Sequence, residues 1–105
     1  MSLRAPIAVA VEIRAPARRV FRLAAAIGED GVRLQRGSSF EPGRPVDVRF
    51  ALPGPGSASG VVPLALRAVI APGEAEDDTL EFVDPSSDSR AAIRHYVHER
   101  LGLPT

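Results

Sequence analysis

The chain of 105 residues contains no cysteine, no tryptophan and no lysine. Without cysteine, a disulfide framework, a thiolate metal site and a cysteine nucleophile are all excluded. No apolar run approaches the roughly 20 residues that a membrane-spanning helix needs, and no leader joins a charged region to an apolar one. These absences predict a soluble, cytoplasmic protein that does not bind membranes.

The charges balance, because 13 basic residues meet 13 acidic ones. Non-specific binding to DNA or RNA requires a basic excess, so we expect no nucleic-acid partner. Every basic residue is arginine. Any cluster of them would therefore offer planar, bidentate donors suited to phosphate, carboxylate or guanine.

Alternation of apolar and polar side chains predicts six β-strands. The clearest alternation runs from Arg19 to Ile27, and its odd-numbered residues, Phe21 and Leu23 among them, are expected to share the buried face with Ile27. The segment Gly28–Gly31 then predicts a tight turn in which glycine permits positive φ. The other strands are expected at residues 7–13, 32–34, 46–52, 61–71 and 80–82, with the inward side chains Ile7, Val9, Val11, Ile13, Val32, Leu34, Val46, Val48, Phe50, Leu52, Val62, Leu64, Leu66, Ala68, Ile70, Leu80 and Phe82.

The apolar period lengthens to three and four residues only near the C-terminal end, where Ile93, Tyr96, Val97 and Leu101 fall on one stripe. This pattern predicts a helix over residues 87–101. The preceding residues 84–86 supply capping oxygens and a first-turn proline, and a glycine and a proline after Leu101 end the helix.

Six strands that are each apolar on one face bury those faces economically by closing on themselves. The predicted fold is therefore mainly β: a six-stranded antiparallel β-barrel with one C-terminal α-helix covering an opening, and with Phe40 plugging one end of the core. We expect a single domain over residues 4–105 and interpret residues 1–3 as an expression leader.

The sequence offers little material for catalysis. His95 and His98 lie three residues apart on the predicted helix, but no third or fourth ligand stands at a recognisable spacing, so we interpret them as solvated surface residues and expect no metal. Neither a Ser-His-Asp order, a nucleophile elbow nor a P-loop occurs, so no catalytic residue and no cofactor is predicted.

Two short motifs have structural interpretations. The segment Arg14–Arg18 spells RxxxR, yet it follows the first strand and contains a proline, so we interpret it as a turn with two solvated arginines. The Gly28–Gly31 turn has the GxxG spacing of KH-type RNA binders, but its central pair is acidic and would repel phosphate.

Several segments, in this order, resemble a PilZ domain: residues 4–7, 26–34, 41–43 before the strand at 46–50, and 80–84 leading into 89–97. The resemblance covers nearly the whole chain. It implies a six-stranded barrel with a C-terminal helix, and a bacterial receptor for cyclic di-GMP. In such domains an RxxxR leader grips guanine and phosphate, and a (D/N)xSxxG turn supplies further polar contacts.

Carried onto this chain, the last glycine of that turn falls on Gly31, its serine on Gly28 and its acidic or amide position on Ala26. Arg4 matches the second leader arginine, and the first would precede Met1. Because glycine and alanine offer no side-chain hydrogen bond, two expected ligand contacts are absent. The candidate ligand-binding residues implied by the resemblance, with neighbouring arginines added, are Arg4, Arg22, Ala26, Gly28, Gly31 and Arg33.

Two functional hypotheses follow. In the first, the domain is a non-enzymatic regulator whose cyclic di-GMP site is degenerate and which acts on a protein partner, bound at the exposed flank of the helix or at the loop of residues 53–60. In the second, arginines at positions 4, 22 and 33 still hold cyclic di-GMP by stacking and phosphate contact. Whether the chain is a monomer or a homodimer stays open.

Overall fold

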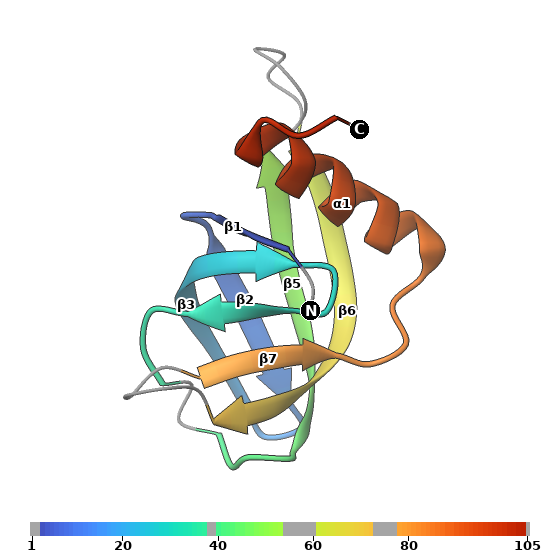
Figure 1. Cartoon of the computed structure of the whole chain (residues 1–105). Coiled ribbons are helices and arrows are strands. Elements are labelled where there is room, and N and C mark those ends of the chain that lie inside the picture. Colours follow the sequence, from blue (N-terminus) through green and yellow to red (C-terminus); the bar gives the residue numbers. More distant parts are fainter. Residues whose placement is uncertain (1–2, 38–39, 54–60, 73–77, 105) are drawn as a thin grey trace.

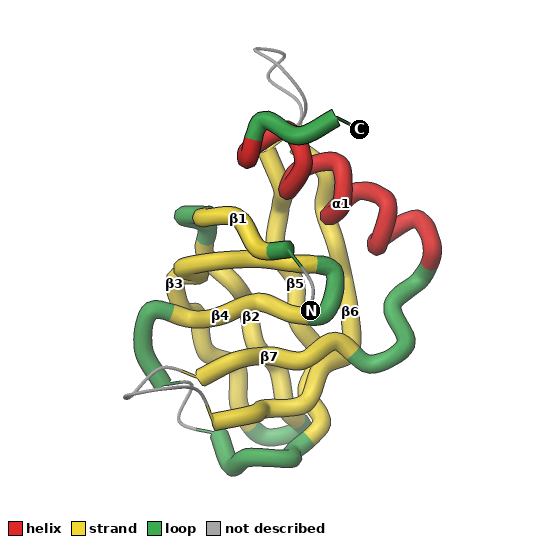
Figure 2. Tube along the Cα trace, in the orientation of Figure 1, coloured by secondary structure: helices red, strands yellow, loops and turns green. Residues whose placement is uncertain are grey.

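The computed structural model describes residues 3–37, 40–53, 61–72 and 78–104, and Figures 1 and 2 show their arrangement. These residues form seven strands and one helix. The elements are β1 (Arg4–Pro6), β2 (Ala10–Ala15), β3 (Arg18–Gly28), β4 (Gly31–Leu34), β5 (Pro45–Pro53), β6 (Val61–Pro72), β7 (Asp78–Phe82) and α1 (Ser87–Leu101).

All strand pairs are antiparallel, and the hydrogen-bonded order is β1-β3-β2-β5-β6-β7-β4, with β4 returning to β3. Strands β2 to β7 therefore close into a six-stranded barrel, as the sequence predicted, and β1 is an additional strand beside β3 (Figure 2). The prediction of one strand over residues 7–13 was wrong in its bounds, because residues 7–9 connect β1 to β2.

Strand β3 changes face along its length. Its pairing with β4 shifts register between Ala24 and Ala26, and a bulge of this kind reverses the alternation of side chains. Ala24 and Ile27 are both fully buried although they are three residues apart. The prediction that Phe21 and Leu23 share the buried face of Ile27 was therefore wrong: they lie outside the barrel, 56% and 53% exposed.

The remaining inward positions agree with the predicted alternation. The predicted inward side chains of β2, β4, β5 and the later part of β6 are buried, as is Leu80 of β7, while Val9, Val62 and Phe82 are half-buried against the same core. Phe40 is 9% exposed, which confirms that it packs into the core. The loop of residues 40–44 lies at the end of the barrel away from α1 (Figure 1).

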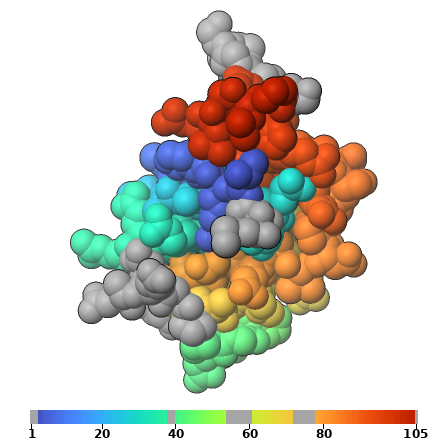
Figure 3. Space-filling view, viewed as in Figure 1, coloured from blue at the N-terminus to red at the C-terminus, as the bar shows by residue number. Residues whose placement is uncertain are grey.

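Helix α1 spans the predicted residues. The Ser86 hydroxyl accepts a hydrogen bond from the Ser89 amide, and Gly102 ends the helix in the left-handed conformation at φ 72°. Ile93 and Val97 are buried and fix the helix on one end of the barrel, against β1 and β3 (Figures 1 and 3). The predicted stripe was too long, because Leu101 is 40% exposed. The proline at position 85 precedes the cap rather than occupying the first turn.

Candidate functional site

The hairpin between β3 and β4 places two acidic residues, Glu29 and Asp30, at a corner of the barrel. Gly28 and Gly31 form its closing pair. Among the described residues only Asp84, Gly43 and Gly102 have positive φ, so the expectation that these two turn glycines are needed for left-handed backbone was wrong. Their role is steric instead.

Both glycines allow another strand to approach closely. A Cβ at Gly28 would lie 2.6 Å from the carbonyl oxygen of Leu3, just before β1. A Cβ at Gly31 would lie 2.3 Å from the carbonyl oxygen of Leu80 in β7. Real Cβ atoms do not come this close to oxygen, so any larger residue at either position has to displace backbone.

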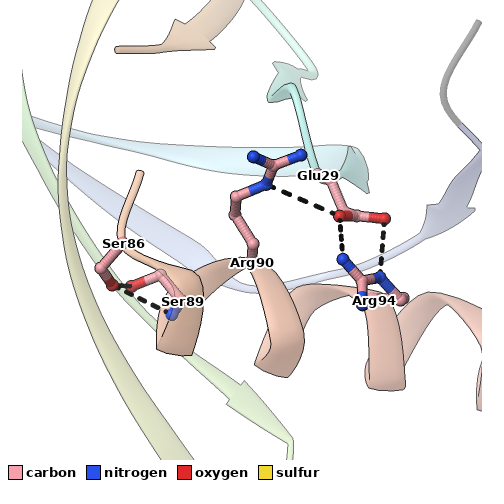
Figure 4. Close-up of polar contacts among 5 residues, drawn as sticks. All are labelled: Glu29, Ser86, Ser89, Arg90 and Arg94. Atoms are coloured by element: carbon pink, nitrogen blue, oxygen red, sulfur yellow. Dashed lines mark hydrogen bonds and ion pairs between the residues drawn. The ribbon is translucent and has the colours of Figure 1, made fainter. Parts of the chain in front are cut away.

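Two arginines of α1 hold the turn from the side of the helix (Figure 4). The Arg94 guanidinium donates two hydrogen bonds to the Glu29 carboxylate, from Nε at 3.2 Å and from Nη2 at 3.0 Å. Arg90 adds an ion pair, with its Nε 3.8 Å from Oε1 of Glu29. The hydrogen bonds from Arg94, and then the charges of Arg94 and Arg90, lower the pKa of Glu29 despite partial desolvation, and Glu29 raises the pKa of Arg94.

The second acidic residue of the turn, Asp30, is paired with an arginine of β1. Arg4 Nη2 lies 3.6 Å from Asp30 Oδ2, and the side chains of the two residues are 34% and 52% exposed. We call the set Arg4, Glu29, Asp30, Arg90 and Arg94 the arginine corner. It holds three guanidinium groups and two carboxylates, and both carboxylates already contact guanidinium groups of the same chain.

The structure brings together most, but not all, of the candidate ligand residues. Gly28 is the register partner of both Arg4 and Gly31, and Ala26 is the register partner of Arg33. Arg22 lies elsewhere along β3: its Nε donates to the Gly37 carbonyl at 3.2 Å and its Nη1 to the Phe21 carbonyl at 2.9 Å. A single ligand at the turn would therefore be within reach of the first group and not of Arg22.

The other motifs lie away from this corner. Arg14 and Arg18 flank the turn between β2 and β3, at the opposite end of β3, as predicted for the RxxxR segment. Arg14 contacts Glu12 at 3.7 Å, while the Arg18 guanidinium stands 4.8 Å from the Phe40 ring centroid, so Arg18 is not simply solvated.

The two histidines have separate partners. His95 Nε2 is 3.2 Å from Glu99 Oε2, and His98 Nδ1 is 2.8 Å from the Pro104 carbonyl oxygen. Within the described part of the chain, no three His, Asp or Glu side chains gather as a metal site would require. In the same residues, no helix combines the length and apolar character needed to span a membrane.

Sequence reasoning missed the contribution of Arg90 and Arg94. Their spacing of four places both on one side of the helix, next to the buried stripe of Ile93 and Val97. That spacing was a usable signal. The sequence does not show how α1 is rotated on the barrel. This rotation directs Arg90 and Arg94 toward Glu29, which lies 65 residues before Arg94 in the chain.

A scan against protein-family models found no match, and a search of curated proteins found no relative. Solved structures do match. The structure of the Bacillus subtilis inhibitor of motility (MotI/DgrA) aligns with 97% of this chain at a TM-score of 0.76 and 18% identity. The PilZ domain of CeSA from a cellulose-synthesizing bacterium aligns with 91% of this chain and 95% of its own length, at a TM-score of 0.61 and 14% identity. The chain has a PilZ-type fold.

The match to MotI/DgrA covers 51% of that protein, so this chain spans about half its length. The PilZ-type fold was the architecture that the sequence resemblance implied. Within it, the arginine corner is the place where anion-binding groups converge, between β1, the β3–β4 turn and α1. The contacts with Glu29 and Asp30 engage some of the N–H donors of these arginines, so an anionic ligand would compete with the two carboxylates.

Proposed function

We propose that this domain is a non-enzymatic bacterial regulatory domain of PilZ type, in which the cyclic di-GMP site is degenerate and signalling proceeds through a protein partner. The observation that carries the proposal is the environment of Gly28, the position that corresponds to the ligand-binding serine. A side chain there would meet the Leu3 carbonyl at 2.6 Å. Main chain therefore occupies the space in which the serine side chain would begin.

The expected loss of affinity is large. A hydrogen bond to a charged group contributes about 1.5–3 kcal/mol, so losing the contacts at Ala26 and Gly28 weakens binding by roughly two to four powers of ten. The pairing of Arg4 with Asp30 and of Arg94 with Glu29 adds a further cost, because a phosphate would compete with these carboxylates for the same guanidinium groups.

A regulatory rather than catalytic role agrees with the chemistry of the corner. General acid–base catalysis requires a group that exchanges its proton near the working pH. Glu29 has a pKa that is lowered, and Arg94 a pKa that is raised, so both groups are held in their charged forms. Charged groups fixed in this way suit recognition and structural pairing.

Isothermal titration calorimetry of the purified chain with cyclic di-GMP tests the proposal. We expect no binding heat up to several hundred micromolar nucleotide. Micromolar binding overturns the degenerate site. A matched pair of variants separates the two causes: Gly28→Ser restores the missing hydroxyl, and Glu29→Gln with Asp30→Asn releases the arginines.

We expect Gly28→Ser to remain silent in this titration, since its side chain collides with β1. The released-arginine variant is expected to bind inorganic phosphate or cyclic di-GMP only weakly and non-specifically. If that variant gains micromolar affinity for cyclic di-GMP and not for phosphate, the wild-type chain fails to bind because its arginines are paired with Glu29 and Asp30. The absence of side-chain hydrogen bonds at Ala26 and Gly28 would then not be the cause.

The alternative function is a true cyclic di-GMP receptor. The observation that favours it is the convergence of Arg4, Arg90 and Arg94 on one turn, because guanidinium groups bind phosphate in a bidentate manner and stack on guanine. Arg22, which the sequence analysis had grouped with Arg4 and Arg33 for this role, hydrogen-bonds elsewhere. The same calorimetric titration decides between the two functions.

A further inference from the structure

The outer face of the sheet formed by β3, β2, β5 and β6 carries an unusual arrangement of side chains. Strand register aligns these side chains in rows that cross the four strands. One row contains Phe21, Glu12, Arg49 and Ala65, and a neighbouring row contains Leu23 beside Ala10 and Ala51 beside Pro63. Bulky apolar groups therefore stand on β3, whereas the neighbouring strands carry small residues in one row and the charged Glu12 and Arg49 in the other.

A depression, which we call the outer groove, lies on this face. It has a volume of about 440 Å³, and its lining includes Ala10, Glu12, Phe21, Arg49, Ala51 and Ala65. Glu12 is itself within 3.7 Å of Arg14. Phe21 is 56% exposed and Leu23 53% exposed at its β3 side. Helix α1 packs on other elements, chiefly β1 and β3 near the end of the barrel.

The next row of the same face is basic. It contains Arg19, Arg14, Asp47 and Arg67. The last three of these line a second hollow of about 300 Å³ that shares Arg49 and Ala65 with the outer groove. Across the two rows, four arginines meet two carboxylates. Two ion pairs form within these rows, Arg14 Nε to Glu12 Oε1 at 3.7 Å and Arg67 Nε to Asp47 Oδ1 at 3.4 Å, and they leave an excess of two arginines. Arg14 and Arg19 are direct cross-strand partners, and like charges in this arrangement destabilise a sheet.

We propose that the outer groove is the docking site for an acidic amphipathic helix of a partner protein. Its apolar residues would rest on the alanine floor against Phe21, and its carboxylates would face Arg14, Arg19 and Arg67. The proposal rests on the proposed function, because it supplies the protein contact that the function requires. The outer groove takes the place of the helix flank, which the sequence analysis had named as one docking site. The other site named there, the loop of residues 53–60, lies outside the described residues apart from Pro53.

The dimensions fit one helix. Adjacent strands lie about 4.8 Å apart, so the side chains of β3 and β6 that border the groove are separated by roughly 14 Å. An α-helix with its side chains is about 10–12 Å wide. The closed barrel also disfavours the other common mode, strand addition, because each of β2 to β7 pairs with at least two strands. Among the described strands, short β1 alone has a single neighbour.

Charge decides against a second copy of the chain as the occupant. A symmetric dimer places the same patch on both sides of its interface. Two outer faces would then bring together two surfaces with the same excess of arginine. An acidic partner instead neutralises that excess, as electrostatic complementarity between partners requires.

Two synthetic amphipathic helical peptides test the inference on the ¹⁵N-labelled full chain by NMR titration. They share one leucine-rich apolar face and carry either glutamate or lysine on the polar face. We expect the glutamate peptide to bind and to shift the amides of Ala10, Phe21 and Ala51. The lysine peptide should bind at least about tenfold more weakly, and added salt should weaken the glutamate peptide.

The variant Phe21→Ser should lower affinity for the glutamate peptide at least about tenfold, since a central aromatic contact is lost. Leu101→Ser is the matched control, because Leu101 is also an exposed apolar residue but lies at the end of α1. It should leave the affinity unchanged.

Three outcomes overturn the inference: shifts that map to α1 instead of the groove, equal affinity for the two peptides, or a concentration-dependent dimer whose interface includes Phe21. None of them affects the silence of the arginine corner toward cyclic di-GMP, which calorimetry measures separately. Conversely, micromolar cyclic di-GMP binding with a functional outer groove would overturn the proposed function alone.

Discussion

The arginine corner and the outer groove differ in what their side chains contact. At the corner, charged groups from β1, the β3–β4 turn and α1 are paired with one another, and the backbone is packed so closely that two positions require glycine. On the outer face, apolar side chains of β3 remain exposed beside a row rich in arginine. Both regions contain ion pairs within the chain, since Arg14 contacts Glu12 and Arg67 contacts Asp47 on the outer face. The outer face differs in that it exposes large apolar side chains and holds two more arginines than carboxylates, whereas the corner holds one more. We therefore expect a protein partner to bind the outer face.

The largest predicted effect separates the two sides of β3. Ile27→Ala removes a fully buried side chain and is expected to lower the free energy of unfolding by about 2–5 kcal/mol. Phe21→Ala, on the exposed side of the same strand, should change it by about 0.5 kcal/mol or less. Urea denaturation measures both. Equal losses would show that Phe21 belongs to the core, and the outer groove would lose its main contact.

Ile27 and Phe21 also show where burial could no longer be predicted from the sequence. Alternation predicted the barrel, most of its core and the helix, because those segments follow one period without interruption. In β3 the bulge between Ala24 and Ala26 reverses the alternation, and three consecutive alanines give no contrast between polar and apolar positions that could reveal it. The alternation therefore predicted that Phe21 is buried. Phe21 is exposed instead and lines the outer groove.

The candidate site shows a similar limit. Arg4, Ala26, Gly28 and Gly31 were found by their resemblance to a motif, and local strand pairing brings them together. Arg90 and Arg94 reach the same turn through tertiary packing of α1. Similarly, the reason for glycine at positions 28 and 31 is the approach of strands that are distant in sequence, which no local pattern encodes.

The second prediction compares the two turn glycines. Gly31→Ala forces its Cβ against the Leu80 carbonyl inside the closed barrel and is expected to cost about 1–3 kcal/mol of stability. Gly28→Ala meets the Leu3 carbonyl beside β1, a three-residue strand with one open edge that can shift, so it should cost less. Thermal unfolding of the two variants gives the order. The reverse order would mean that β1 is anchored more firmly than β7.

A third prediction concerns the pH dependence of the corner. The hydrogen bonds from Arg94 lower the pKa of Glu29 from its ordinary value of 4.5, so ionised Glu29 stabilises the folded chain above pH 4.5. This contribution is lost as the pH falls below 4.5 and through the lower pKa of the folded state. In Glu29→Gln, we therefore expect a shallower loss of stability on acidification over that range.

Thermal unfolding of wild type and Glu29→Gln, compared between pH 3 and pH 6, measures the difference. Glu81→Gln serves as the control, because Glu81 is an exposed carboxylate on β7. Identical pH profiles for wild type and Glu29→Gln would mean that the contacts of Glu29 with Arg90 and Arg94 do not contribute in solution. The arginines of the corner would then be as available to anions as those of the outer face.

The smallest predicted effect tests whether the outer face is arranged for binding rather than for stability. Arg19 lies directly opposite Arg14 across β3 and β2. Replacing Arg19 by threonine removes the like-charge pair and introduces a residue that favours strands, so the free energy of unfolding should rise by about 0.2–1 kcal/mol. The same variant should bind the glutamate peptide more weakly. A gain in stability together with a loss of affinity would mean that this pair of arginines is unfavourable in the isolated domain and favourable in the complex. A loss of stability would instead assign Arg19 a structural role, because its guanidinium lies 5.8 Å from the Phe21 ring centroid.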